Sequence, residues 1–322
     1  MSSASCWLSV ILPTYNGARH LESTLDSLVA QEEMDFEVIV VDDGSTDATP
    51  EILRRYSKRL PMAVVESRHT GNWVANTNVG IRVAKGRYLG WLHQDDTWRR
   101  DRVSKLKRLT SRWPEALLVL HPVWFIDAGG RRIGPWRCPL PSRTRYLGAA
   151  ELVGHLLVQN FVASTAPVFR AEAASKVGGL DEQLWYVADW DFWLKLARLG
   201  RSVYLPSPLS SVRLHRDSQT VTRASNTEDL QHQYAAVLSR YLPEWEQRHP
   251  NGRSVGRAAR FSARLNMALL SHVAGRKVPW RGLLGDFVRL GPVGWHVFLR
   301  DSRIIERSIS RIRAGLGRPP GR

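Results

Sequence analysis

Short apolar runs alternate with segments of helical periodicity over the first hundred residues, and this alternation restricts the fold most strongly. The apolar runs are WLSVILP at 7–13, FEVIVV at 36–41, MAVV at 62–65 and YLGWL at 88–92. The first two are rich in Val and Ile and almost uninterrupted, which is typical of strands covered on both faces of a parallel sheet. Segments such as 76–85 predict the intervening helices. The order of strand, helix and strand therefore predicts an α/β fold with right-handed crossovers.

A polar cluster follows each predicted strand. The clusters are PTYNG at 13–17, DDGSTD at 42–47, RHTGN at 68–72 and HQDD at 93–96. Ligands of such folds bind beyond the carboxyl ends of the strands, so we expect the four clusters to form one rim. Neither the glycine-rich dinucleotide fingerprint after the first strand nor a P-loop motif occurs. Aspartates would repel phosphate groups unless a divalent cation lay between them, so HQDD indicates Mg²⁺ or Mn²⁺ bridging the protein and a diphosphate.

The length and composition suit one large globular domain, or a domain with an appended subdomain. The chain has 322 residues, of which 43% are hydrophobic. Its two cysteines, Cys6 and Cys138, cannot build a disulfide framework and have no partners at metal-ligand spacing, which favours a reducing compartment. Since the sequence shows neither a signal-peptide pattern nor a run of about 18 apolar residues, we expect a cytoplasmic protein without a membrane-spanning helix.

Positive charge is concentrated toward the C-terminus. The formal net charge is +16, and residues 253–322 hold 15 Lys and Arg residues against 3 Asp and Glu. Such a field favours an anionic partner, namely nucleic acid, an anionic membrane surface or a phosphorylated substrate. The alternative is a solvated basic face that has no specific partner.

Helical periodicity dominates from about residue 221. TEDLQHQYAAVLSRYL and RAARFSARLNMALLSHVAG predict two helices. From residue 280 onward, Trp, Leu, Phe and Val are interspersed with arginines, which is typical of a helix lying in the plane of an anionic membrane surface. Helices that pack on the rest of the protein, with arginine side chains reaching toward water, are the alternative. We therefore predict a basic helical C-terminal extension at 221–322.

Five segments occur in the order found in the family 2 glycosyltransferases. They are SVILPTYNGARHLESTLDSLVAQ, FEVIVVDDGSTDATPEIL, NVGIRVAKGRYLGWLHQDD, GGLDEQLWYVADWDFWLKLARLG and VRLHRDSQT. The chain resembles this family over residues 9–220. The resemblance implies a GT-A fold, with a Rossmann-like, mostly parallel sheet flanked by helices. It also implies a catalytic domain at 1–220, with a nucleotide-sugar half at about 1–98 and an acceptor half at about 99–220. Similar proteins use a nucleotide-diphosphate sugar, usually with a divalent cation, and invert the anomeric centre.

The resemblance assigns six residues of the first three segments to the nucleotide sugar, and Asp95 is one of them. Pro13 and Tyr15 of PTYN would surround the base, and Asp42 and Asp43 would contact the base and the ribose through charge-assisted hydrogen bonds. Asn78 is assigned to the nucleotide sugar as well. The alternative for the two aspartates is that they cap the helix that follows them.

The metal motif of the family is usually Asp-x-Asp, and HQDD departs from it. His93 stands where the first aspartate is usual, Asp95 matches the aspartate that reaches the cation, and Asp96 is assigned to the acceptor side. His93 is then a metal ligand, a partner of ribose or phosphate, or a packing residue. The preference of hard cations for oxygen ligands disfavours the first of these roles.

Two further residues are assigned to the diphosphate. Arg213 and His215 alternate on an apparent strand, so their side chains face the same side. In the family an Arg-x-His pair closes over the diphosphate, and the histidine can join the metal. An arginine fork suits phosphate oxygens, although a lone histidine is more often structural.

Asp189 is the predicted catalytic base. It matches the second residue of a Glu-Asp pair that is common in the family, and Ala188 replaces the first. The base would take the proton of an acceptor hydroxyl as that oxygen attacks the anomeric carbon. Asp191 is the competing carboxylate, with a charge at a helix N-terminus as its structural alternative. Trp185 and Trp190, with Asp191 and Asp96, are assigned to the acceptor side; core packing is the alternative for the aromatic rings.

The sequence therefore predicts an inverting glycosyltransferase that moves a sugar from a UDP- or dTDP-type donor to a glycan or lipid-linked glycan in cell-envelope polysaccharide synthesis. Loose similarity to bacterial rhamnosyltransferases supports this substrate class, and we expect the protein at the inner face of the cell membrane. A non-catalytic glycan- or nucleotide-sugar-binding relative is the alternative, suggested by His93 and Ala188. A nucleic-acid-binding protein is the third, but no groove-reading or base-stacking motif accompanies the charge.

Overall fold

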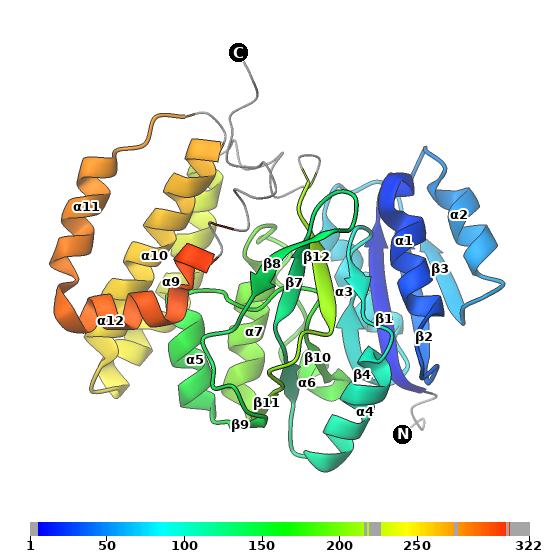
Figure 1. Ribbon diagram of the computed structural model, residues 1–322, viewed down its shortest axis with the longest axis horizontal. Helices are drawn as coiled ribbons and strands as arrows, with labels where there is room; N and C mark the ends of the chain where they lie inside the picture. The colour runs from blue at the N-terminus through cyan, green and yellow to red at the C-terminus, as the bar shows by residue number, and fades with distance from the viewer. Residues whose placement is uncertain (1–5, 216–217, 219–226, 274–275, 307–308, 310–322) are drawn as a thin grey trace. The chain divides into compact units, whose positions relative to one another are not determined.

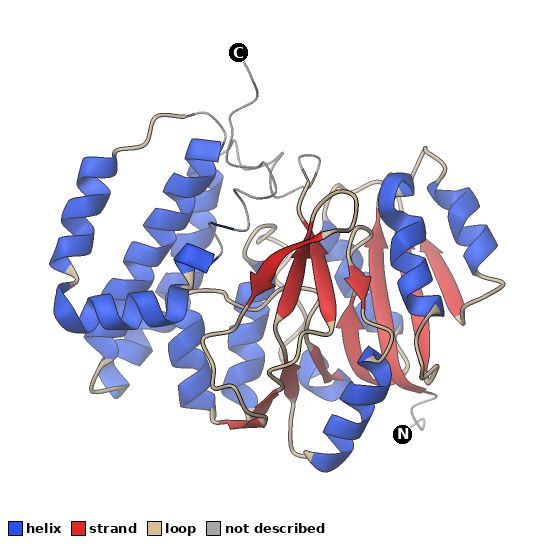
Figure 2. Ribbon diagram, viewed as in Figure 1, coloured by secondary structure: helices blue, strands red, loops and turns tan. Residues whose placement is uncertain are grey.

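An eight-stranded sheet, with strands between Cys6 and Tyr204, organises the first two thirds of the chain (Figures 1 and 2). The computed structural model describes residues 6–215, 218, 227–273, 276–306 and 309. The chain divides into two compact units. Unit 1 comprises Met1–Trp124, Pro141–Ala149 and Val162–Val212, and unit 2 comprises Phe125–Leu140, Ala150–Phe161 and Arg213–Arg322. The predicted domain boundary between residues 220 and 221 lies outside the described residues.

The sheet of unit 1 has the strand order β3-β2-β1-β4-β10-β6-β11-β9. Its first four strands are β1 (Cys6–Thr14), β2 (Phe36–Asp42), β3 (Met62–Glu66) and β4 (Gly86–Trp91). These strands pair in parallel, which confirms the parallel arrangement predicted for the first hundred residues. The remaining strands are β6 (Leu118–Leu120), β9 (Arg145–Leu147), β10 (Val168–Arg170) and β11 (Ser202–Tyr204). The sheet becomes mixed because β10 pairs antiparallel with both β4 and β6.

Helices flank this sheet, as predicted (Figure 2). They are α1 (Ala18–Val29), α2 (Thr49–Tyr56), α3 (Trp73–Val83), α4 (Arg102–Arg112), α6 (Ala171–Lys176) and α7 (Ala188–Leu199). In α1, Leu21, Leu25 and Leu28 recur at helical spacing and are fully buried against the sheet. A short strand, β5 (Thr97–Trp98), pairs antiparallel with β12 (Ser210–Arg213).

Unit 2 is mostly helical. Its helices are α9 (Thr227–Arg248), α10 (Gly252–Val273), α11 (Trp280–Arg289), α12 (Gly291–Ser302) and all but the first residue of α5 (Ala149–Val158). It also contains β8 (Arg132–Trp136) and the second half of β7 (Val123–Ile126), which begins in unit 1. The helix α10 packs on α9, α11 and α12. The helices predicted beyond residue 221 are therefore present. No helix in the described part of the chain is both long and apolar enough to cross a membrane.

A buried arginine connects several elements of unit 1. Arg102 is fully buried, and its guanidinium donates to the carbonyl oxygen of Ala166 at 2.9 Å and to Ser210 Oγ at 3.0 Å. It also contacts His121 Nε2 and lies 4.3 Å from the ring centroid of Trp98. Burial lowers the pKa of Arg102 to about 9, and burial with the Arg102 charge lowers the pKa of His121 well below 6.5. A neutral His121 can accept a hydrogen bond from the guanidinium, so both Nη atoms have partners although no carboxylate is among these contacts, whereas the buried Nε has none among the described residues.

Close packing between strands makes one glycine of the sheet irreplaceable. A Cβ added to Gly86 at the start of β4 would lie 2.4 Å from the backbone nitrogen of Ser9 in β1. We expect Gly86→Ala to lower the free energy of unfolding by about 2 kcal/mol, because the backbone of a central strand cannot move aside cheaply. Urea denaturation measures this change. Gly148→Ala is the matched control, since a Cβ there meets nothing within 4 Å, and equal stability of the two variants would contradict the packing.

Candidate active site

The loops after β1 and β2 hold each other through side-chain to backbone hydrogen bonds. Asn16 has a positive φ of 45°, and its Oδ1 accepts from the backbone nitrogen of Thr46 at 2.8 Å. Its own backbone nitrogen donates to Ser45 Oγ at 2.9 Å. The next residue, Gly17, donates its N–H to Thr49 Oγ1 at 2.8 Å. The ends of β1 and β2 are therefore fixed relative to one another before any ligand is present.

The loop after β4 is tied to the end of β1 by the side-chain amide of Gln94. Its Oε1 accepts from Thr14 Oγ1 at 2.7 Å and from the backbone nitrogen of Tyr15 at 2.9 Å. Its Nε2 donates to the carbonyl oxygen of Tyr15 at 3.1 Å. A Cβ at Gly17 would lie 2.5 Å from Gln94 Oε1, so this glycine makes room for the amide.

The third loop is anchored by the carboxylate of Asp43. This side chain is buried, and it accepts from the backbone nitrogens of Thr70 and Gly71, both at 2.8 Å. His69 Nδ1 lies 3.1 Å from Asp43 Oδ2. The His69 ring in turn stacks on Tyr15, with ring centroids 4.2 Å apart. Tyr15 is 37% exposed, so the stacked pair presents an aromatic surface to solvent at the rim.

Asp42 bonds within its own turn. The side chain is buried, and its Oδ1 accepts from Ser45 Oγ at 2.5 Å. Pro13, at the end of β1, is also buried. Neither aspartate of DDGS bonds to the first turn of α2, whose Thr49 backbone nitrogen donates to Asp47 instead, so their alternative role as caps of that helix is wrong. Asp42 bonds within its own turn, and Asp43 bonds to the third loop. Their contacts with a base and a ribose stay predictions.

Asn78 joins α3 to the loop before α7. Its Nδ2 donates to the carbonyl oxygen of Leu180 and to Glu182 Oε1, both at 2.9 Å, and its Oδ1 accepts from the Leu180 backbone nitrogen at 2.9 Å. Gly179 in this loop has a φ of 72° and lies so close that a Cβ would be 2.7 Å from Asn78 Oδ1. The amide of Asn78 therefore positions the loop that leads to Asp189, and a direct contact with the nucleotide sugar stays a prediction.

His93 is half-buried between aromatic and hydroxyl groups. Its Nε2 lies 2.8 Å from Ser164 Oγ, which also accepts from Trp91 Nε1 at 2.6 Å. Trp73 makes an edge contact with the imidazole at a centroid distance of 5.3 Å. Burial lowers the pKa of His93, and the negative charge of nearby Asp95 opposes this shift without cancelling it. The imidazole is therefore neutral near pH 7.

The two candidate base carboxylates have different surroundings in α7. Asp189 lies in the first turn, is 9% exposed, and accepts from the Trp190 backbone nitrogen at 2.7 Å. Asp191 is fully buried and forms an ion pair with Lys195 Nζ at 2.8 Å. The pairing of Asp191 with a residue one turn later favours a structural role for it.

The aromatic residues near Asp189 divide into buried and partly exposed ones. Trp190 is 3% exposed, and Trp193 is fully buried and stacks on Trp91 with centroids 5.0 Å apart. Trp185 is half-buried, and its carbonyl oxygen accepts from Trp73 Nε1 at 2.7 Å. Core packing therefore accounts for Trp193 and for most of the surface of Trp190, whereas Trp185 retains an accessible face.

Arg213 and His215 belong to unit 2. The Arg213 side chain is buried, and its Nη1 donates to the carbonyl oxygens of Asp127 and Ala128 at 3.2 and 3.1 Å. His215 is half-buried. The hydrogen bonds of Arg213 fix its place beside the turn between β7 and β8. The predicted contacts of Arg213 and His215 with a diphosphate or a metal stay predictions.

Comparison with known sequences identifies the domain that carries the strand-end loops. Residues 9–165 match the sequence model of the family described as Glycosyl transferase family 2. This chain carries a glycosyl transferase family 2 domain. An uncharacterized glycosyltransferase of Rickettsia prowazekii is 24% identical over 238 residues, which cover 74% of this chain and 73% of the relative.

Solved structures show that the glycosyltransferase has the predicted GT-A-type fold. S. aureus TarS 1–349 in complex with UDP-GlcNAc matches with a TM-score of 0.68 at 18% identity, covering 97% of this chain and 90% of that one. This chain spans 55% of a longer TarS chain. The mannosyltransferase PcManGT from Pyrobaculum calidifontis, in complex with GDP-Man and Mn²⁺, matches with a TM-score of 0.58 at 18% identity, covering 96% of this chain and 87% of that one.

The carboxylate of Asp95 is the oxygen ligand that the candidate site offers to a hard divalent cation. Asp95 is half-buried in the turn after β4, close enough to His93 for its charge to affect the imidazole. Among the described residues, no group of three or more His, Cys, Asp or Glu side chains could hold a metal ion. Mg²⁺ is typically bound through one or two carboxylates together with substrate phosphates, so a single carboxylate such as Asp95 fits that mode of binding.

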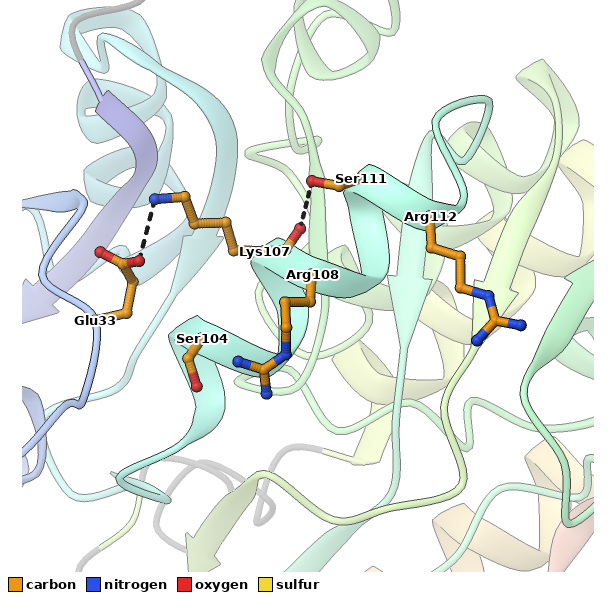
Figure 3. Close-up of a pocket in the computed structure, with 6 residues that line it drawn as sticks. All are labelled: Glu33, Ser104, Lys107, Arg108, Ser111 and Arg112. Carbon is orange, nitrogen blue, oxygen red and sulfur yellow. Dashed lines mark hydrogen bonds and ion pairs between the residues drawn. The ribbon is translucent and has the colours of Figure 1, made fainter.

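A cavity of about 590 Å³ lies along α4 rather than at the strand-end loops (Figure 3). Its lining comprises Glu33, Ser104, Lys107, Arg108, Ser111 and Arg112. Lys107 forms ion pairs with Glu33 Oε2 at 3.1 Å and with Asp35 Oδ2 at 2.7 Å. None of the residues predicted for the site lines this cavity, and we assign it no part in the reaction.

Three residues that position the site were not predicted individually. Gln94 was part of a quoted motif without a role, and His69 lay within RHTGN. Ser164, which contacts His93, lies about 70 residues further along the chain. A polar cluster at a strand end signals the first two, whereas nothing local in the sequence connects Ser164 with His93.

The lowered pKa of His93 predicts how the free energy of unfolding depends on pH. Because the folded-state pKa lies below the unfolded value of about 6.5, the unfolded chain binds more protons in between, and acidification destabilises the fold. This contribution is fully present above pH 6.5 and is lost as the pH falls through the folded-state pKa. We expect the free energy of unfolding in urea to fall less between pH 7.5 and pH 5.0 in His93→Gln than in the wild type. His121 titrates in both proteins and cancels, so equal falls would contradict the burial of a neutral His93.

Proposed function

We propose that this glycosyltransferase transfers a sugar, with inversion at the anomeric carbon, from a nucleotide-diphosphate sugar to a hydroxyl group of a glycan or lipid-linked glycan. The observation that carries the proposal is the rim of interlocked loops after β1 to β4, with Asp95 in the turn after β4. The complexes of TarS with UDP-GlcNAc and of PcManGT with GDP-Man and Mn²⁺ support a donor of this class.

The nucleotide occupies the rim in this proposal. The exposed face of Tyr15, held by its stacking on His69, offers a flat surface for a base. Asp43 is bonded to the third loop and lies next to this surface. Its carboxylate would fix the loop and accept from the base or the ribose. We propose a donor of the UDP or dTDP type.

Asp95 would hold the divalent cation, Mn²⁺ or Mg²⁺, together with the phosphate oxygens of the donor. When bound, the cation neutralises charge that develops on the diphosphate leaving group. His93, neutral near pH 7 and fixed by Ser164, would accept or donate a hydrogen bond beside the phosphates and is a second candidate ligand. Arg213 and His215 keep their proposed roles, the arginine at the diphosphate and the histidine as a metal ligand.

Asp189 would act as the catalytic base. The acceptor oxygen attacks the anomeric carbon from the face opposite the diphosphate, the bond from that carbon to the phosphate oxygen breaks, and the hydroxyl proton passes to the Asp189 carboxylate. One base suffices for a single in-line displacement, unlike the paired carboxylates of glycosidases. Of the other residues assigned to the acceptor side, Trp185 offers a ring face for stacking on a sugar, and Asp96, Trp190 and Asp191 would support the acceptor pocket from buried positions.

The acceptor and the cellular role follow from the same resemblance. We propose a role in cell-envelope polysaccharide synthesis, at the inner face of the cell membrane, where nucleotide sugars and lipid-linked acceptors meet. A non-catalytic, nucleotide-sugar-binding protein is the second candidate. It is favoured by His93 and Ala188, which stand where the family usually has carboxylates.

Two substitutions separate catalysis from donor binding. We expect Asp189→Asn to lower the rate of nucleoside diphosphate release from a panel of UDP-, dTDP- and GDP-sugars by about 100-fold or more, with donor affinity nearly unchanged, because the base acts in the transition state. We expect Asp95→Asn to weaken metal-dependent donor binding by about tenfold or more. Glu51→Gln, an exposed acid on α2, is the control.

The outcomes distinguish the two candidate functions. Wild-type turnover by Asp189→Asn would reject its role as base, and unchanged metal dependence in Asp95→Asn would reject that residue as ligand. Donor binding without turnover by the wild type on any sugar and acceptor tested would favour the non-catalytic candidate.

A further inference from the structure

Exposed apolar side chains concentrate in the last helices of unit 2. Of the eleven large apolar side chains that are exposed among the described residues, seven lie between residues 280 and 309. On α11, Trp280, Leu284 and Val288 are 47%, 65% and 59% exposed. These three residues are spaced four apart, so they form one stripe along the helix, here called the α11 stripe. Isolated exposed apolar residues are ordinary, but an aligned set marks an interaction surface.

The apolar side of α11 extends beyond the part that its neighbouring helices cover. Leu283 on the same helix and Leu290, its C-cap residue, are 8% and 4% exposed. Phe287 packs on Phe261 and Phe298, with ring centroids 5.7 and 6.2 Å apart. Contacts with α10 and α12 bury this side of the helix (Figure 1). The α11 stripe continues the same apolar side beyond the buried part. A helix that only needed to pack on its neighbours would carry polar residues there.

Positive charge accompanies the α11 stripe. Arg281 lies seven residues before Val288, hence on the same side of the helix, and it is exposed. Asp286, the acid of α11, is held in ion pairs by Arg264 and Arg289, so it does not offset Arg281. Arg281 forms no ion pair with any other described residue. Residues 253–322 as a whole carry an excess of 12 positive charges.

We propose that the α11 stripe is a docking surface for an anionic lipid bilayer, in which α11 lies parallel to the membrane plane. An apolar stripe flanked by arginine buries its side chains at the boundary between headgroups and acyl chains, while the cations contact lipid phosphates. A second copy of the chain is a poorer occupant, because it would bring two surfaces of the same positive sign together. The α11 stripe does not depend on the proposed donor site, and the two can be tested separately.

Vesicle co-sedimentation of the full chain tests this surface. The probes are vesicles of pure phosphatidylcholine and vesicles of equal parts phosphatidylcholine and phosphatidylglycerol, neither containing a sugar acceptor. The test variant is Leu284→Glu with Val288→Glu. The matched control is Met34→Glu with Val83→Glu, which makes the same kind of change at exposed residues of unit 1. We expect the wild type to bind the anionic vesicles about tenfold or more tightly than the neutral ones, with weaker binding at high salt.

The test variant should lose about tenfold or more of the binding to anionic vesicles, and the control should keep binding within about twofold of the wild type. Circular dichroism and urea denaturation check that both variants are folded. Wild-type binding by the test variant would overturn the proposal. So would a wild-type dimer in analytical ultracentrifugation that the test variant abolishes while vesicle binding persists, because the α11 stripe would then be a contact between copies.

Discussion

The site depends on hydrogen bonds that hold the loops after β1 to β4 to one another. A parallel sheet brings these loops to one edge, but side chains fix their conformation. The side-chain amide of Gln94, the side-chain oxygen Oδ1 of Asn16 and the carboxylate of Asp43 each bond to the backbone of a neighbouring loop. Because each bond satisfies a backbone N–H that no strand or helix uses, the rim is rigid before a donor arrives. Such preorganisation lowers the entropic cost of binding a flexible diphosphate sugar.

The departures from the family pattern are accommodated within this frame. A histidine replaces the first carboxylate of the metal motif; burial lowers its pKa and keeps it neutral near pH 7, and Ser164 holds its ring. This arrangement removes one negative charge from the place where a diphosphate would lie, which reduces repulsion toward the donor and lowers the number of carboxylates available to a cation. Ala188 removes a second carboxylate next to Asp189 and is fully buried, so its methyl group fills space in the core. Both changes lower the negative charge of the site and leave Asp95 and Asp189 in place.

The sequence predicted the parallel half of the fold well, because its strands are long, apolar and separated by helical periodicity. It also predicted helical structure beyond residue 221. It did not predict that β10 would pair antiparallel with β4, since a strand of three residues carries no usable pattern. The candidate site was predicted as a set of motifs, but not the contacts among them. Asn78 with Leu180, and His93 with Ser164, join residues that are 102 and 71 positions apart, and only the folded chain brings them together. The burial of Arg102 next to His121 was likewise not predicted, because charged residues are usually assigned to the surface.

The claim that the rim binds a nucleotide diphosphate is tested most directly by isothermal titration calorimetry of the purified protein with UDP, dTDP and GDP, each with and without Mn²⁺. The account predicts that one nucleotide binds, and that Mn²⁺ tightens its binding by about tenfold or more, because the cation bridges Asp95 and the phosphates. A folded protein that binds none of the three nucleotides, with or without Mn²⁺, would contradict it.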